Sequence, residues 1–229
     1  MGYYSSKDKK IGVGLYTITP EKLFTLFPDI QPPQIRLAWA LYKQLGKEWI
    51  EKSRESYRSE GHVDVRGRKS AVEALMQKLA SLSRDIFTSS DYSFAESITQ
   101  NICQGISCLV DISGLRSEDQ KRTVCLPASA VAEHYKRMWE QNYEEWQKLP
   151  TFLITLEEAH EFLDPEKPRT IFSGIALTYR KYRVGLNAVT PRRSRINFDV
   201  FTELWTKLVM KTELRRDRTY LTENTPYLE

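Results

Sequence analysis

Short, almost wholly apolar runs alternate with helical patterns through the second half of the chain, and this alternation constrains the fold most. Runs of strand length occupy residues 106–113, 151–156, 184–190 and 206–212. Strands without a polar face are covered on both sides, as in a parallel sheet that lies between layers of helices. The pattern predicts an α/β fold with a mostly parallel sheet and flanking helices, in which active groups sit at the carboxyl ends of the strands.

Helical patterns separate these strands. They are expected at residues 94–102, from Ser117 to about Trp146 with a kink or break at Pro127, at 169–182, at 198–204, and from about Glu213 onward.

Helical periodicity dominates the first part of the chain. A short helix is expected from Pro20 to Phe27, because Thr19 and Pro20 suit a helix start. Apolar residues then recur at spacings of three and four over residues 33–58 and again over residues 69–84. We therefore expect a mainly helical segment over residues 1–92, followed by an α/β core over residues 93–229.

Composition sets broad limits on function. With 229 residues, of which 41% are apolar, the chain is long enough for one substantial core. Its formal net charge of +4 permits nucleic-acid binding without arguing for it. No apolar run approaches the roughly 20 residues that span a bilayer, so no membrane contact is expected.

The chain has three cysteines, Cys103, Cys108 and Cys125, and no CxxC pair. We expect reduced thiols, two of them buried, rather than a metal site or a disulfide. This use of cysteine favours a cytoplasmic protein.

The segment that carries chemistry is TFLITLEEAHEF, residues 151–162. Its apolar strand ends in two adjacent carboxylates, Glu157 and Glu158, which would be costly to bury without a cation. A nucleotide-bound Mg²⁺ would balance them, with one carboxylate orienting the metal's water shell and the other polarising the water that attacks the γ-phosphate. Spacing leaves a second interpretation open: the acids begin a helix over residues 159–163 and suit its dipole.

LITLEEAHEFL resembles the Walker B segment of the HerA family of DNA translocases, which are relatives of FtsK. Three further segments resemble the family in the same order. They are GISCLVDISGLRSEDQK at residues 105–121, RKYRVGLNAVTPRRSRI at 180–196 and WTKLVMKTELRRDRTYLTENTPYL at 205–228. The resemblance covers roughly residues 70–229, and the ordered series is more specific than any one segment.

The resemblance implies part of a RecA-like P-loop ATPase core that uses ATP and Mg²⁺. Glu157 would support Mg²⁺ through water, and Glu158 would be the catalytic carboxylate. His160 belongs to the family signature, with a local hydrogen bond at a helix start as the alternative to a direct chemical role. The resemblance also implies that the nucleotide is contacted by Arg180, Lys181, Thr190 and Arg192, the first two near a subunit boundary, where a neighbour's nucleotide is reached.

The chain departs from the family at several points. No GxxxxGK[ST] loop occurs in it, so we expect a C-terminal part of a longer ATPase. Pro191 stands where the family has a sensor Gln, and a proline side chain cannot hydrogen-bond an attacking water. Leu177 replaces an Arg and Tyr179 a Gly of the family, and Arg193 replaces a Pro. ATP hydrolysis by this chain without further parts is therefore not expected.

Two clusters of basic residues are candidates for contact with DNA phosphates. One follows the sensor strand and consists of Arg192, Arg193 and Arg195; the other consists of Arg66, Arg68 and Lys69. A solvated charged loop is the alternative interpretation of the first cluster.

The function implied by the resemblance is that of a HerA-like, ATP-dependent DNA translocase or helicase in DNA end processing and repair. Its partners would be DNA, further copies in a hexameric ring and a NurA-like nuclease. A non-catalytic assembly or regulatory module derived from such an ATPase is the alternative. A helical DNA- or protein-binding domain over residues 1–90 is a third reading, although no reader motif occurs there.

Overall fold

The computed structural model describes residues 1–5, 11–211 and 213–224, and it divides into two compact units, Met1–Val131 and Ala132–Glu229. The boundary falls within the long helix α6 (Ser117–Gln141). Both units combine helices with short parallel strand pairs, so the α/β class is confirmed. None of the described helices is long and apolar enough to cross a membrane.

The first unit contains two parallel strand pairs. Strand β1 (Gly2–Ser5) pairs with β4 (Cys108–Asp111), and β2 (Val13–Gly14) pairs with β3 (Phe87–Thr88). Because β4 pairs with the amino-terminal strand, the stretch around residues 93–131 packs with the first unit. The functional division at residue 92 remains a prediction.

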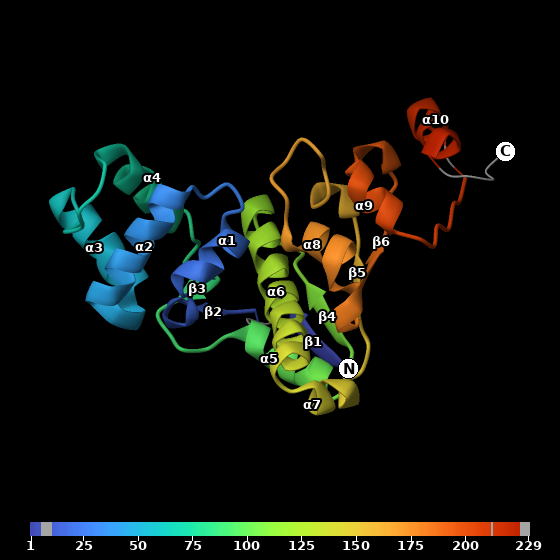
Figure 1. Cartoon of the computed structure of the whole chain (residues 1–229). Coiled ribbons are helices and arrows are strands. Elements are labelled where there is room, and N and C mark those ends of the chain that lie inside the picture. Colours follow the sequence, from blue (N-terminus) through green and yellow to red (C-terminus); the bar gives the residue numbers. More distant parts are fainter. Residues whose placement is uncertain (6–10, 212, 225–229) are drawn as a thin grey trace. The chain divides into compact units, whose positions relative to one another are not determined.

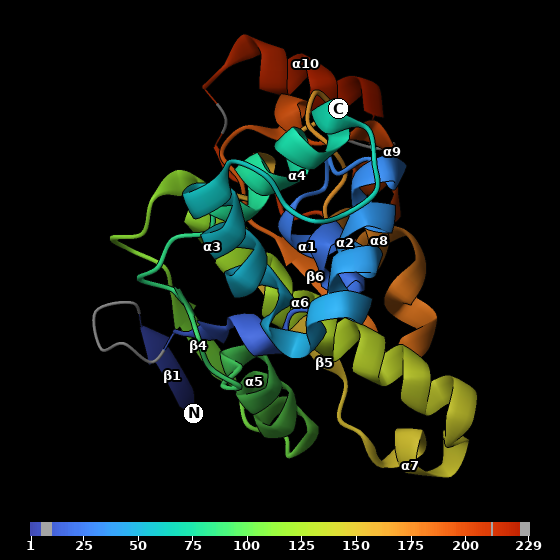
Figure 2. The same ribbon diagram turned by 90° about the vertical axis from the view of Figure 1, so that its left-hand side faces the viewer.

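Helices α2 (Pro32–Leu45), α3 (Trp49–Glu60) and α4 (Lys69–Ala80) pack on one another in the first unit (Figures 1 and 2). The single helix expected over residues 33–58 is wrong, because Gly46 breaks it. Its φ of 67° and ψ of −151° suit only glycine. Trp49, fully buried after the break, donates its indole N–H to the Ile18 carbonyl at 2.8 Å.

Shorter elements complete the first unit. A 3-10 turn at Pro20–Lys22 and helix α1 (Leu23–Leu26) occupy the helix expected over residues 20–27. Helix α5 (Phe94–Cys103) lies where predicted.

All three cysteines are free, but the expectation of two buried thiols is wrong, since only Cys125 is buried. That burial raises the pKa of Cys125 to about 12.

Pro127 does not break α6, which continues to Gln141. The expected extension to Trp146 is instead a separate helix, α7 (Tyr143–Lys148), capped by the Asn142 side chain. In the second unit α7 is followed by β5 (Phe152–Leu156), α8 (Ile171–Thr178), β6 (Val184–Ala188), α9 (Phe198–Glu203) and α10 (Arg215–Asn224).

Strands β5 and β6 form a parallel pair, and α8 packs against β6 (Figure 1). Phe172 and Ile175 of α8 and Val184 of β6 are buried there, which explains the apolar pattern of these elements. The expectation that the strands are covered on both faces is wrong, because Leu153 on β5 is 60% exposed. One helix was expected from Arg169 to Tyr182. The structure has the shorter helix α8 there, followed by a 3-10 turn at Tyr179–Tyr182.

The strand expected over residues 206–212 is absent from residues 206–211, and residue 212 lies outside the described residues. Leu208 is 92% exposed and Met210 is 86% exposed. An extended segment becomes a strand only when a neighbour supplies backbone hydrogen bonds. No described strand supplies them here.

Candidate functional site

The two strands of the second unit end together. In the parallel register Leu156 lies opposite Ala188, so both chains leave the sheet at the same edge. The pairing continues past the strands, since Val189 N–H donates to the Leu156 carbonyl and Ala159 N–H to the Val189 carbonyl, each at 3.0 Å. The segment after β5 is thereby held beside Thr190, which follows β6.

Glu157 and Glu158 stand at this carboxyl edge, as predicted. Glu158 has φ 50° and ψ 43°, a left-handed conformation that costs a non-glycine residue roughly 1–2 kcal/mol. The strained residue turns the chain from β5 into a 3-10 turn, Ala159–Glu161, rather than the expected α-helix over residues 159–163. Strain of this kind is kept where the surroundings fix it, and such positions concentrate at functional sites.

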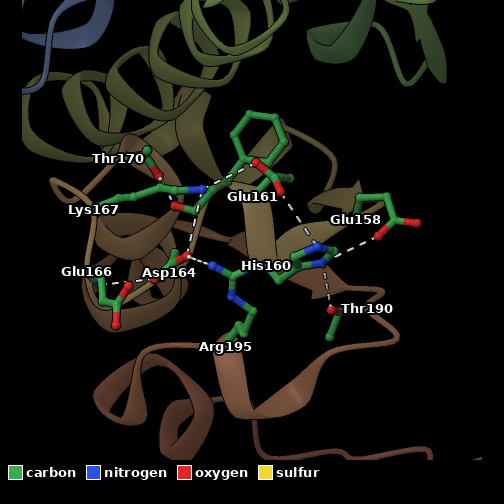
Figure 3. Close-up of polar contacts among 10 residues, drawn as sticks. Glu158, His160, Glu161, Asp164, Glu166, Lys167, Thr170, Thr190 and Arg195 are labelled. Carbon is green, nitrogen blue, oxygen red and sulfur yellow. Dashed lines mark hydrogen bonds and ion pairs between the residues drawn. The ribbon is translucent and has the colours of Figure 1, made fainter. Parts of the chain in front are cut away.

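His160 lies at the centre of the site and is buried, with 7% of its side chain exposed. Its Nδ1 is 3.1 Å from Thr190 Oγ1 and 3.3 Å from Glu158 Oε2 (Figure 3). A carboxylate only accepts hydrogen bonds, so the contact with Glu158 is attractive when Nδ1 carries a proton. His160 thus joins the end of β5 to the end of β6 and orients Glu158. The hydrogen bond of the His160 side chain is made to Thr190, which follows the other strand, rather than locally, and its contacts within its own segment are ion-pair distances to Glu158 and Glu161.

A chain of ionic contacts extends from His160 to the loop after β6 (Figure 3). Glu161 lies 3.7 Å from His160 Nε2 and 3.3 Å from Lys167 Nζ. Lys167 in turn lies 3.7 Å from Asp164, whose other close cation is Arg195 at 3.3 Å. We call these residues the strand-end network: Glu158, His160, Glu161, Asp164, Lys167, Thr190 and Arg195.

Asp164 anchors this network. Only 4% of its side chain is exposed, and Oδ1 accepts the Glu166 N–H at 3.0 Å. A buried carboxylate needs such partners, because removing charge from water is costly. Arg195 is therefore engaged with Asp164. Arg192 is exposed, and it is held through its backbone, whose N–H donates to Thr190 Oγ1 at 3.1 Å and whose carbonyl accepts the Arg195 N–H at 3.2 Å. Arg193 is half-buried between them.

Arg180 and Lys181 lie at the opposite end of β6 from Glu157 and Glu158. They precede Val184, and β6 spans about 13 Å at roughly 3.3 Å per residue. Arg180 lies over the Trp205 ring at 5.1 Å, and Lys181 over the Tyr182 ring at 4.9 Å. Within one chain these cations do not face the same ligand as the carboxylates.

The remaining predicted residues belong to other elements of the chain. Arg66 and Arg68 are exposed before α4 in the first unit, and the exposed Lys69 begins that helix and lies 3.9 Å from Glu73. Tyr179, where the family has Gly, hydrogen-bonds to Glu133 through its hydroxyl. Burial and this bond raise the pKa of Tyr179 well above its ordinary value.

The carboxylates suit a hydrated Mg²⁺ rather than a metal enclosed by protein. Among the described residues, no group of three or more His, Cys, Asp or Glu side chains is placed to hold a metal ion. Glu157 is exposed and makes no ion pair with any described residue. Mg²⁺ keeps several waters and takes one or two carboxylates together with substrate phosphates, so the donor set fits that mode of binding.

Sequence reasoning did not identify Asp164, Lys167 or Glu161 as parts of the site. These three charged residues follow Glu158 within ten positions of the sequence. Such closeness in sequence is only a weak signal for an ionic network. The partner that decides their role, Arg195, comes from beyond the next strand.

No family model matches the chain. A curated relative does: the chain is similar to the DNA double-strand break repair helicase HerA of Pyrococcus furiosus. The two are 24% identical over 203 residues, which cover 76% of this chain. The chain spans only 37% of the length of that relative. A distant HerA-like relation is therefore supported.

Proposed function

We propose that residues 151–196 form the acidic half of a HerA-like ATPase site within a RecA-like core. The strained Glu158, held by the buried His160 against Thr190, carries this proposal. The similarity to HerA supports it, and the geometry matches what water activation needs: a fixed carboxylate at the edge where two parallel strands end.

In this proposal the two carboxylates divide the work. Glu157 is exposed and free to contact the water shell of Mg²⁺, which neutralises phosphate charge when it is bound with ATP. Glu158, whose side chain is 64% exposed, faces solvent with one oxygen next to His160 and the other available to polarise the attacking water. The phosphate-binding loop is absent from residues 1–229, so another segment or chain has to supply it.

Arg180 and Lys181 act on a different nucleotide in this proposal. Because they lie at the amino end of β6, they serve the site of a neighbouring copy in an oligomeric ring. DNA is the substrate by analogy with the relative, and Arg192, which is exposed and makes no ion pair with any described residue, is placed to meet a phosphate.

The test is ATP hydrolysis by a complete ATPase that contains residues 151–196 together with a phosphate-binding loop. Glu158→Gln should lower turnover by about 100-fold or more while ATP still binds, since removing a positioned catalytic group typically costs that much. Glu157→Gln should raise the Mg²⁺ concentration needed for half-maximal turnover. Glu166→Gln is the control, because Glu166 is an exposed carboxylate on the same segment. Unchanged turnover in Glu158→Gln would contradict the role of Glu158.

A second candidate function is a non-catalytic assembly module. Pro191 in the sensor position favours it, since proline offers no side-chain donor to a phosphate. In that case the chain would pack beside a complete HerA-type subunit and donate Arg180 or Arg192 to it. Light scattering of the chain with and without such a subunit separates the two functions: strictly monomeric behaviour in both samples rules out the module.

A further inference from the structure

A cavity of about 340 Å³ in the first unit is lined by three arginines, Arg54, Arg58 and Arg84. Its walls come from α3, from the loop after α4 and from β3 with the serine that follows it. The side chains of Leu15 and Phe87 also line it and are 3% and 1% exposed, so they form part of an apolar floor. We call this site the arginine pocket.

The fold brings these arginines together from two elements. Arg54 and Arg58 are four residues apart on α3, so they lie on the same side of that helix. Arg84 approaches from the loop between α4 and β3. None of the three guanidinium groups has a carboxylate within 4.0 Å among the described residues. Arg54 makes only a long contact, 3.5 Å, with the Leu82 carbonyl.

The two glutamates of the pocket do not cancel this charge. Glu51 is already hydrogen-bonded through both oxygens, because Oε2 accepts from the Tyr16 hydroxyl at 2.9 Å and Oε1 from Ser89. Glu55 is exposed and forms no ion pair with the arginines. Burial lowers the pKa of Arg54, and the charges of Arg84 and Arg58 lower it further. The Glu51 carboxylate acts on the pKa of Arg54 in the opposite sense, yet three arginines against two glutamates leave the lining of the cavity with a net positive charge.

We propose that the arginine pocket binds a phosphate group. Guanidinium groups donate paired N–H bonds to the oxygens of phosphate, and three of them converge on one cavity here. A phosphate with close to two negative charges relieves the repulsion among them more fully than a single carboxylate does. The cavity lies within the range of small-ligand sites, which run from about 300 to 1,000 Å³. The group belongs either to a mononucleotide or to a DNA backbone.

This proposal concerns the first unit and does not rest on the ATPase proposal. Calorimetry with inorganic phosphate and with AMP tests whether the pocket binds the phosphate of a small molecule. Fluorescence anisotropy with a labelled DNA duplex, with and without competing phosphate, tests whether it binds a phosphate of the DNA backbone. All measurements use the full chain at low ionic strength, because surface electrostatics weakens with salt.

Arg84→Gln and Arg58→Gln should each weaken binding by about tenfold or more, since each removes a charge-assisted contact. Both side chains are exposed and make no hydrogen bond or ion pair with any described residue, so their replacement should leave the circular dichroism spectrum unchanged. Arg36→Gln is the matched control, an exposed arginine on α2 outside the pocket.

Each outcome decides the question. Saturable binding of phosphate and AMP that depends on Arg58 and Arg84, with DNA binding unaffected, supports a small phosphate ligand. DNA binding that depends on the same arginines and is competed by phosphate supports a backbone phosphate. Binding that is absent, or equal in the wild type and both variants, overturns the proposal.

Discussion

The strand-end network and the arginine pocket hold their charges in opposite ways. In the network every cation has a carboxylate within 4.0 Å, down to the buried Asp164 with Lys167 and Arg195. In the arginine pocket the three guanidinium groups have none among the described residues. The network thus joins its cations to carboxylates by direct contact, whereas the arginines of the pocket make no such contact with a described carboxylate.

This difference separates charges that fix geometry from charges that await a ligand. Paired charges in the network hold the loop after β6 against the segment after β5, and so position Glu158. The three arginines of the pocket repel one another, and an anion bound among them offsets that repulsion. Variants in the network should therefore change stability, and variants in the pocket should change binding.

The largest effect on stability is expected for Asp164→Ala, at about 2–3 kcal/mol. The change removes a carboxylate that is 4% exposed and leaves Arg195 and the Glu166 N–H without their acceptor. The estimate is below that for a fully buried pair, because 41% of the Arg195 side chain is exposed to water. Urea denaturation measures the change in the free energy of unfolding.

Asp85→Ala is the matched change beside the arginine pocket. Its side chain is exposed, so we expect less than about 0.5 kcal/mol. Equal losses in Asp164→Ala and Asp85→Ala would mean that the network does not hold the strand end.

Three strands were predictable, because contiguous apolar runs locate β4 of the first unit and β5 and β6 of the second within a few residues. The carboxylate pair at the end of β5 is also a local feature. The strand over residues 206–212 was wrongly predicted for residues 206–211, since an apolar pattern does not guarantee a neighbouring strand. The exposed Leu153 shows the same limit: the pattern indicates apolar faces and leaves open what covers them.

Long-range pairing accounts for what sequence reasoning missed. Asp164 is paired through Arg195, which lies beyond β6, and the arginine pocket is completed by Arg84 from a separate loop. The break at Gly46 was missed for a different reason. The apolar spacing continues across it from α2 into α3, and only the positive φ reveals the end of the first helix.

A smaller loss, about 1 kcal/mol, is expected for Thr190→Val. The hydroxyl accepts the Arg192 N–H at 3.1 Å and lies 3.1 Å from the buried His160, so valine leaves both without this partner. Thr155→Val on β5 is the control, because its hydroxyl is exposed and has only a 3.4 Å contact with Asn187. Thermal unfolding should show a lower midpoint for Thr190→Val only. A midpoint equal to that of the wild type would mean that His160 is held without Thr190.

Replacing Glu158 with glycine should stabilise the chain by up to about 1 kcal/mol, because glycine adopts a positive φ without strain. Glu157→Gly should have the opposite sign, since the φ of Glu157 is not positive and glycine there adds only disorder to the unfolded chain. Urea denaturation of both variants gives the two signs. A loss of stability in Glu158→Gly would show that the contact with His160 outweighs the backbone strain.

The smallest effect is a pH dependence that originates beside the arginine pocket. Hydrogen bonds from Ser89 and Tyr16 lower the pKa of Glu51 below its ordinary value of 4.5. A carboxyl group with a lowered folded-state pKa stabilises the protein above the unfolded-state pKa, and this stabilisation is lost as the pH falls through the lower, folded-state value. The wild type should therefore lose more stability than Glu51→Gln as the pH falls below 4.5, and the two should run parallel above it.

Thermal midpoints between pH 3 and 7 measure this, with Glu55→Gln as the control for an exposed, unpaired carboxylate in the same pocket. Parallel curves over the whole range would mean that the Glu51 hydrogen bonds do not stabilise the wall of the pocket.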